Sequence, residues 1–137
     1  MTQDAPRLGC GAAIVVDGRI LLLKRLRDPE AGCWGIPGGK VELFETAAAA
    51  VEREMLEEVG LTIHAAALLC VADQIDRARE THWFSAIYRV DAFAGEPVNL
   101  EPHKHAAMAW FPLAAPPEPL TRATVVTLAA LAGREGG

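Results

Sequence analysis

The chain has 137 residues, of which 51% are hydrophobic and 23% are charged, and its formal net charge is -5. This size and composition are typical of one globular domain and exclude two full domains, so we expect residues 1–137 to form a single domain. The acidic balance argues against a general nucleic-acid binder, because affinity for phosphate backbones comes from clustered lysines and arginines. An acidic ligand would therefore need local cations or a bound metal.

Cysteine usage indicates the compartment. Cys10, Cys33 and Cys70 form no CxxC pair and leave an odd thiol, a pattern that favours a reducing environment over a secreted disulfide scaffold. No stretch approaches about 18 consecutive apolar residues, and Met1–Arg7 lacks the basic start and apolar run of a signal peptide. We therefore expect a soluble, cytoplasmic protein with no membrane partner.

The first predicted elements form a β-hairpin. Ala12–Val16 and Ile20–Leu23 are apolar, and Asp17-Gly18 between them is a strong two-residue turn signal. A charged surface loop follows over Arg25–Gly32.

A specially shaped loop and a helix come next. Pro37-Gly38-Gly39 predicts irregular backbone, since proline removes a donor and glycine readily takes positive φ. Glu45–Val59 is rich in good helix formers, and Gly60 stands where a C-terminal cap belongs. On a helical wheel, one apolar stripe should face the core; it consists of Ala48, Val51, Met55 and Val59.

The rest of the chain predicts more strands and a closing helix. Leu61–Val71 and His82–Val90 have the content of strands that pair across the charged stretch Asp73–Glu80. Ala109–Phe111 predicts a last short strand, and Thr121–Leu131 a closing helix beyond a proline-rich connector. Strands before, between and after two helices, without regular βαβ alternation, indicate an α+β fold with a mixed sheet packed between helices.

The sharpest chemical feature is a group of glutamates on the predicted helix. Glu54, Glu57 and Glu58 leave the same side of one turn. Like charges four residues apart destabilise a helix by about 0.2 to 0.5 kcal/mol, so another group should neutralise them. Mg²⁺ or Mn²⁺ would do so, because both prefer carboxylate and water oxygens. The alternative is a solvated acidic face on an alanine-rich helix.

The glycine loop before the helix strengthens the metal interpretation. Gly38 and Gly39 can bring backbone groups close to an oxygen-rich ligand. A Walker-type phosphate loop is excluded, because Lys40 is followed by Val41 rather than Ser or Thr. Phosphates would therefore be held through metal.

These residues carry a family resemblance. Gly39, five residues, Glu45, seven residues and then Arg53-Glu54-Met55-Leu56-Glu57-Glu58-Val59-Gly60-Leu61 resemble the Nudix box, with Met55 as the one soft departure. The resemblance extends to Trp34–Gly38 before the box and to Trp110-Phe111-Pro112 near the C-terminus. It implies an α/β/α sandwich with a mixed β-sheet between helices.

The resemblance also implies an activity and a metal site. Nudix hydrolases cleave a nucleoside diphosphate linked to another group, by water attack on phosphorus with Mg²⁺ or Mn²⁺ on the box helix. Carried over to this sequence, the implied metal ligands are Glu54, Glu57, Glu58 and the Gly39 carbonyl.

Other residues take roles by the same resemblance. Arg53 matches the arginine that orients a catalytic glutamate, here Glu57, although a plain surface ion pair is the alternative. Glu45 matches a structural box position. The extra carboxylate, as metal ligand or base, is expected to be Glu101, with Glu80 as second choice.

Substrate contacts are expected from basic and aromatic residues. Arg25 resembles an arginine that reaches the phosphates, with an exposed strand-end charge as the alternative, and Lys40 is similar. Trp34 is the expected aromatic contact with the substrate. Trp83 and Phe84 are the other candidates. For all three, the alternative is packing in the core, where aromatic residues of strands are more often found.

Histidine spacing does not support a zinc site. His82, His103 and His105 lack a partner cysteine pattern or a helical HExxH, so surface or strand positions are expected.

Nucleoside triphosphates are the leading substrates, cleaved to monophosphate and pyrophosphate. The ADP-ribose branch tends to carry a proline beyond the box, and Leu61–Gly95 contains none. A tyrosine that marks the dinucleoside polyphosphate branch is also missing, since Tyr88 is the only tyrosine. The alternatives are an ADP-ribose or nucleotide-sugar pyrophosphatase, and a nucleotide-sensing module without turnover. Members of this size are often dimers, so the resemblance allows a homodimer.

Overall fold

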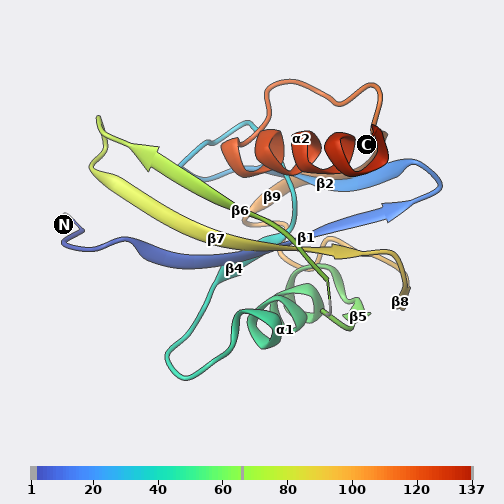
Figure 1. Cartoon of the computed structure of the whole chain (residues 1–137), viewed down its shortest axis with the longest axis horizontal. Coiled ribbons are helices and arrows are strands. Elements are labelled where there is room, and N and C mark those ends of the chain that lie inside the picture. The colour runs from blue at the N-terminus through green and yellow to red at the C-terminus, as the bar shows by residue number, and fades with distance from the viewer. Residues whose placement is uncertain (1–2, 66, 137) are drawn as a thin grey trace.

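The computed structural model describes residues 3–65 and 67–136. A mixed seven-stranded sheet lies between two helices, one on each face, as Figure 1 shows. This is the α+β sandwich expected from the sequence. The strands are β1 (Arg7–Val16), β2 (Arg19–Arg25), β3 (Trp34–Gly35), β4 (Gly38–Lys40), β5 (Thr62–Ile63), β6 (Ala67–Asp76), β7 (Thr81–Val90), β8 (Phe93–Ala94) and β9 (His105–Pro112), and the helices are α1 (Ala47–Val59) and α2 (Arg122–Gly136).

Strand β1 organises the sheet. The main path runs β3-β2-β1-β7-β6, while β4 pairs with β1 and β9 pairs with β2. Strands β1 and β7 are parallel, which makes the sheet mixed. The predicted hairpin is confirmed: Val15 lies opposite Ile20, and Asp17 and Gly18 take φ values of 51° and 74° in the turn. Strands β5 and β8 form a separate two-stranded sheet.

The expectation of irregular backbone at Pro37-Gly38-Gly39 was wrong for the glycines. Gly38 and Gly39 belong to β4, which runs antiparallel to β1. A Cβ at Gly38 would overlap the carbonyl oxygen of Cys10. Glycine is needed here for close approach of two strands and not for positive φ.

Helix α1 begins two residues later than expected. Thr46 has extended backbone and accepts the Ala49 N–H with its hydroxyl at 3.0 Å, so it is the N-cap and Glu45 lies outside the helix. Gly60 ends the helix in the left-handed conformation at φ 70°, as predicted. The predicted apolar stripe faces the core, with Val51, Met55 and Val59 fully buried and Ala48 packed at its edge.

The expected strand Leu61–Val71 is not continuous. Strand β5 pairs with β8, a short strand that the sequence did not indicate, and Ala66 lies outside the described residues. The Ala65 N–H donates to the Glu52 carboxylate at 2.9 Å instead of to a neighbouring strand. Strands β6 and β7 pair as predicted, but β6 continues to Asp76, into the stretch expected to separate them.

The C-terminal elements are longer than predicted. The expected strand Ala109–Phe111 is part of β9, which pairs along β2, and the closing helix α2 covers the predicted region. Two apolar clusters fill the space between sheet and helices, one under α1 and one under α2. Neither helix in residues 3–65 and 67–136 combines the length and apolar character needed to cross a bilayer.

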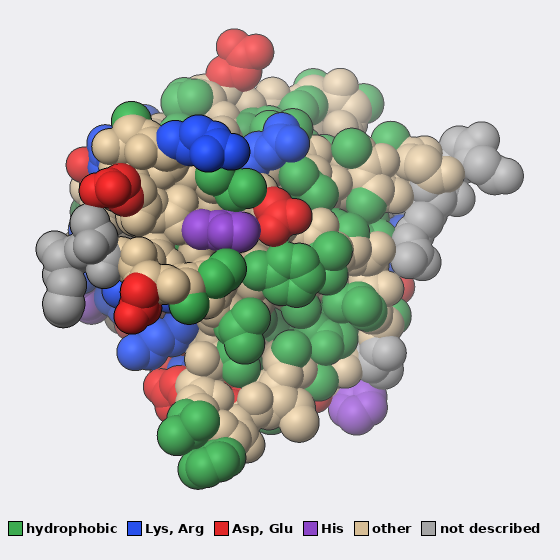
Figure 2. Space-filling model, turned by 60° about the vertical axis from the view of Figure 1, so that its left-hand side comes forward, with side chains coloured by type: hydrophobic (Ala, Val, Ile, Leu, Met, Phe, Trp, Pro, Cys, Tyr) green, Lys and Arg blue, Asp and Glu red, His purple; other side chains and the backbone are tan. Residues whose placement is uncertain are grey.

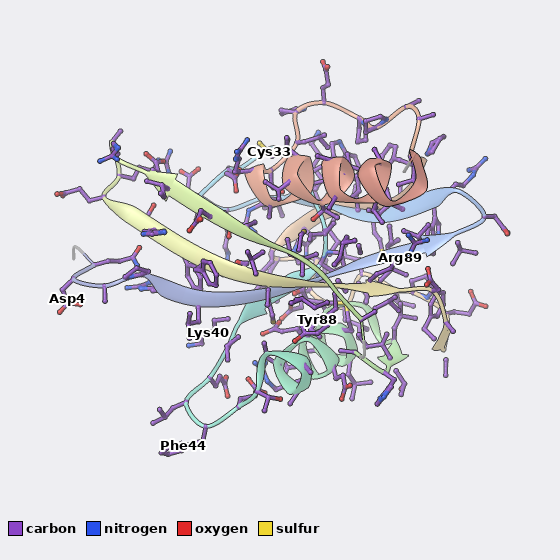
Figure 3. The ribbon with its side chains drawn as sticks, in the orientation of Figure 1. Asp4, Cys33, Lys40, Phe44, Tyr88 and Arg89 are labelled. Carbon is purple, nitrogen blue, oxygen red and sulfur yellow. The ribbon has the colours of Figure 1, made fainter. Side chains whose placement is uncertain are left out.

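Phe44 is placed where a glycine would be favoured. It lies in the segment between β4 and α1, has φ 69°, is 98% exposed and points away from the protein (Figure 3). A bulky side chain in the left-handed region costs about 1 to 2 kcal/mol.

We predict that Phe44→Gly raises the free energy of unfolding by about 0.5 to 1 kcal/mol. The variant relieves the left-handed strain and loses part of the gain to the greater freedom of glycine in the unfolded chain. Urea denaturation would measure the change. Leu43→Gly is the matched control, since Leu43 is also exposed but has no positive φ, and it should be destabilised. Equal losses in both variants would contradict the strain at Phe44.

Candidate active site

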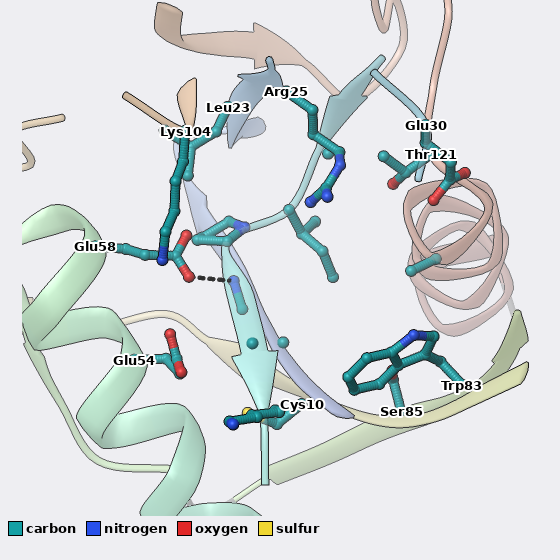
Figure 4. A pocket seen from close by; sticks show the side chains of 18 of the residues that line it. Cys10, Leu23, Arg25, Glu30, Glu54, Glu58, Trp83, Ser85, Lys104 and Thr121 are labelled. Atoms are coloured by element: carbon teal, nitrogen blue, oxygen red, sulfur yellow. Dashed lines mark hydrogen bonds between the residues drawn. The ribbon is translucent and has the colours of Figure 1, made fainter. Parts of the chain in front are cut away.

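Two glutamates of α1 project toward the glycines of β4 (Figure 4). Glu58 is only 3% exposed, and its Oε2 accepts the Gly38 N–H at 3.2 Å. Burial raises the pKa of Glu58 well above its usual value, and the neighbouring Glu54 and Glu101 carboxylates raise it further. A cation placed among these groups would offset the repulsion between the carboxylates, which is one of the causes of the raised pKa.

Gly39 makes room for the second carboxylate. A Cβ at this position would overlap the carboxylate of Glu54. The Glu54 side chain is 14% exposed and therefore lies against the backbone of β4. The lack of a side chain at Gly39 is thus a steric requirement of the carboxylate cluster.

Arg53 ties the start of the box to its helix. Its Nε and Nη2 donate to the two carboxylate oxygens of Glu45 at 2.7 and 2.9 Å, and Nη2 also donates to the Lys40 carbonyl at 3.0 Å. Its Nη1 donates to Glu54 at 2.9 Å and to Glu57 at 3.2 Å. Hydrogen bonds from Arg53 lower the pKa of Glu45 to about 2. Arg53 therefore fixes Glu54 relative to β4.

The loop before β9 brings a third carboxylate to the cluster. Backbone N–H groups of Val98 and Leu100 donate to the carbonyls of Val59 and Glu58, both at 3.0 Å, and hold the loop against the end of α1. Glu101 follows directly, and Lys104 Nζ lies 3.2 Å from its Oε2. Tertiary hydrogen bonds thus position a residue that lies outside the box.

His105 also faces this cluster. It is 8% exposed, and its Nε2 lies 3.8 Å from Glu58 Oε1. Burial lowers the pKa of His105. The sequence analysis expected an ordinary strand or surface histidine here. No local signal could have placed it, because its distance to Glu58 depends on how the loop before β9 packs on α1.

A cavity of about 470 Å³ connects the carboxylates with basic and aromatic groups. Its lining includes Gly39, Glu54, Glu58 and Glu101, together with Arg25, Lys40, Lys104, Trp83 and Ser85. Figure 4 shows Trp83 and Ser85 on the side of the cavity away from α1. Figure 2 shows acidic, basic and histidine side chains interspersed with hydrophobic ones on one face of the protein.

The basic residues have different environments. Arg25 Nε donates to the Pro29 carbonyl at 2.8 Å, so its guanidinium lies at the edge of the cavity beside the loop that follows β2. Lys40 is exposed and lines the cavity next to Gly39.

Several predicted residues do not line this cavity. Glu57 is half exposed and pairs with Arg53. Trp34 packs edge-on against Phe111, with ring centroids 4.8 Å apart, whereas Trp83 lines the cavity. Glu80 lies in a separate shallow depression.

The residues present fit a divalent cation. Ligand atoms of Glu58, Glu101 and His105 lie within 4.8 Å of one another, and Glu54 adds a further carboxylate. The absence of a side chain at Gly39 lets the Glu54 carboxylate lie against β4, beside the other ligand atoms. Carboxylate oxygens are the ligands that Mg²⁺ and Mn²⁺ prefer.

Comparison with known proteins identifies the family. A sequence model described as the NUDIX domain matches residues 6–130. The chain belongs to the NUDIX family. It is accordingly a hydrolase that acts on pyrophosphate bonds, in a family whose members generally use a divalent metal. A crystal structure of a MutT NUDIX hydrolase from Burkholderia pseudomallei has a TM-score of 0.91 and 54% identity, and the match covers 93% of this chain and 99% of that one.

Curated relatives carry different substrate names. An ADP-ribose pyrophosphatase from Methanocaldococcus jannaschii is 40% identical over 66% of this chain and 54% of its own length, so the chain spans about half of that relative. A putative 8-oxo-dGTP diphosphatase 2 from Mycobacterium tuberculosis is 41% identical, over 72% of this chain and 67% of that protein. A CTP pyrophosphohydrolase from Escherichia coli is 32% identical, over 87% and 91%.

We predict that Gly39→Ala weakens divalent-metal binding by about tenfold or more, because the new Cβ displaces the Glu54 carboxylate. Calorimetric titration of Mn²⁺ into the folded variant would measure the loss. Gly133→Ala is the control, since a Cβ there meets no atom within 4 Å. Wild-type affinity in Gly39→Ala would contradict the steric role of Gly39.

Proposed function

We propose that this chain is a metal-dependent pyrophosphohydrolase that converts a nucleoside triphosphate to its monophosphate and pyrophosphate. Residues 1–137 act as one domain in this proposal, and the ion is Mg²⁺ or Mn²⁺. The observation that supports it best is a cavity with two chemically different ends, with Glu54, Glu58 and Glu101 at one end and Trp83 at the other. Such a cavity offers a metal-bound place for phosphates and an aromatic surface for a base.

The proposed metal ligands are Glu54, Glu57, Glu58 and the Gly39 carbonyl. A bound divalent ion would neutralise phosphate charge and lower the pKa of a bound water. Arg53 supports this set by donating hydrogen bonds to both Glu54 and Glu57.

The remaining roles fall to residues around the cavity. Arg25 and Lys40 bind phosphate oxygens in this mechanism, because a guanidinium and an ammonium at the cavity edge complement their charge. Glu101 accepts the proton of the attacking water, and pyrophosphate leaves as the oxygen–phosphorus bond forms. Lys104 holds one oxygen of Glu101, which keeps the carboxylate in place.

A second candidate activity is hydrolysis of ADP-ribose or a nucleotide sugar, which the Methanocaldococcus relative favours. Triphosphates are preferred because that relative is matched over only 54% of its length, whereas the CTP pyrophosphohydrolase is matched over 91%. A sensing module without turnover is disfavoured by the retained carboxylates. The expected homodimer stays a prediction.

A hydrolysis screen tests the proposal. Purified protein with Mg²⁺ or Mn²⁺ would be offered nucleoside triphosphates, including 8-oxo-dGTP, as well as ADP-ribose and nucleotide sugars, and the products would be separated. Monophosphate plus pyrophosphate from a triphosphate supports the proposal. Turnover of conjugates alone supports the second candidate, and ligand binding without turnover supports the sensing module.

We predict that Glu54→Gln lowers kcat/KM by about 100-fold or more while the fold is kept, because the variant removes a charge that holds the metal. Glu52→Gln is the matched control on the same helix: Glu52 accepts the Ala65 N–H and does not line the cavity. Its kcat/KM should stay within about threefold of wild type. Near-normal turnover in Glu54→Gln, with a matched melting curve, would refute the metal assignment.

A further inference from the structure

Glu58, Glu101 and His105 bring two carboxylates and one imidazole to the same point. Their ligand atoms lie within 4.8 Å of one another. Nitrogen and oxygen ligands bind a small divalent ion at about 2.0 to 2.2 Å, so two ligands of one ion lie about 3 to 4.4 Å apart. Small side-chain movements would bring these atoms to coordination distance.

The imidazole of His105 has no hydrogen-bond partner among the described residues, although the backbone of His105 is bonded within the fold. His105 is more than nine-tenths buried, and its Nδ1 has no hydrogen bond among residues 3–65 and 67–136. Its Nε2, at 3.8 Å from Glu58 Oε1, is too distant for a hydrogen bond. An unpaired buried polar group in a native protein calls for an explanation such as a bound water or ion. The nitrogen that faces the carboxylates is Nε2, and it has no hydrogen-bond partner in the part of the chain that the structure describes.

Both carboxylates are oriented through one of their oxygens. Glu58 Oε2 accepts the Gly38 N–H, while Oε1 is the oxygen nearer to His105 Nε2. Glu101 Oε2 is held by Lys104, which leaves Oε1 for another contact. One oxygen of each acidic side chain is therefore held in place, and the Glu58 carboxylate also contacts that of Glu54, so a cation here would lie beside several carboxylates.

We propose that Glu58, Glu101 and His105 form a cation site with a nitrogen donor, which takes a divalent transition-metal ion in preference to Mg²⁺. Magnesium is a hard ion that prefers oxygen ligands, whereas imidazole favours ions of the transition series. The inference rests on the proposed function, because the site shares Glu58 with the proposed box metal set and Glu101 with the proposed catalytic base. It adds a selectivity that the box residues, which are all oxygen donors, do not supply.

Spectroscopy on the wild-type protein tests the nitrogen ligand directly. Mn²⁺ would be added to the full chain without nucleotide, and electron spin echo envelope modulation would be recorded. Coupling to a histidine nitrogen supports the site. Bound Mn²⁺ without nitrogen coupling overturns it and leaves the proposed function standing, whereas a chain that binds no Mn²⁺ overturns both.

Substitution tests the selectivity. We predict that His105→Gln weakens Mn²⁺ binding by about tenfold or more and changes Mg²⁺ binding by less than about threefold. His103→Gln is the control, because His103 is exposed and lies two positions before His105, in the loop that precedes β9. Equal losses for both ions would mean that His105 only supports the loop, and unchanged Mn²⁺ affinity would mean that it is no ligand. Either result would overturn the proposal, and the wild-type spectrum decides it if His105→Gln does not fold.

Discussion

The candidate site depends on how closely α1 approaches β4. The carboxylates of Glu54 and Glu58 lie against strand backbone. Glu54 occupies the space of a Cβ at Gly39, and Glu58 accepts the N–H of Gly38, where a Cβ would overlap Cys10 of β1. A side chain at either glycine would separate helix from strand or β4 from β1. The pairing of β4 with β1 therefore depends on the absence of a Cβ at Gly38, and the position of Glu54 depends on the absence of one at Gly39.

Bringing these acids together is electrostatically unfavourable, and the chain offsets only part of that cost. Arg53 contacts Glu45, Glu54 and Glu57 from the rim, while Lys104 contacts Glu101 on the other side. Glu58, the most buried of the acids, has no cationic side chain at hydrogen-bond distance among the described residues and has a raised pKa. The residual repulsion is what makes the cluster a strong candidate for a divalent ion.

The sequence predicted the parts of the fold that local chemistry determines. The Asp17-Gly18 turn, the Gly60 cap and the apolar stripe of α1 all follow from properties of those residues. The box glutamates were expected on one side of the helix, but only Glu54 and Glu58 line the cavity, and Glu57 is half exposed. Strand β4 was not predicted, because the reason for glycine at position 38 is the close approach of β4 to Cys10 of β1. That contact joins segments that are distant in the sequence. The positions of His105 and Trp83 at the cavity were not predicted either. The packing of loops and strands decides which side chains reach the cavity, and no local pattern in the sequence shows it.

Side chains from both faces of the sheet line the same cavity, and the pairing of β1 with β7 shows how Ser85 reaches it. Trp83 and Ser85 lie on the face covered by α2, whereas Glu54 and Glu58 come from α1 on the other face. Gly9 of β1 lies opposite Ser85, and a Cβ there would come within 2.5 Å of the Ser85 hydroxyl oxygen. The absence of a side chain at Gly9 therefore leaves room for the Ser85 hydroxyl, which lines the cavity. Helix α1 supplies carboxylates at the acidic end of the cavity, and β7 supplies Trp83 at the aromatic end. Substitutions on β7 can therefore change which ligand fits without moving the carboxylates. Relatives with different substrate names can share one hydrolytic chemistry for this reason.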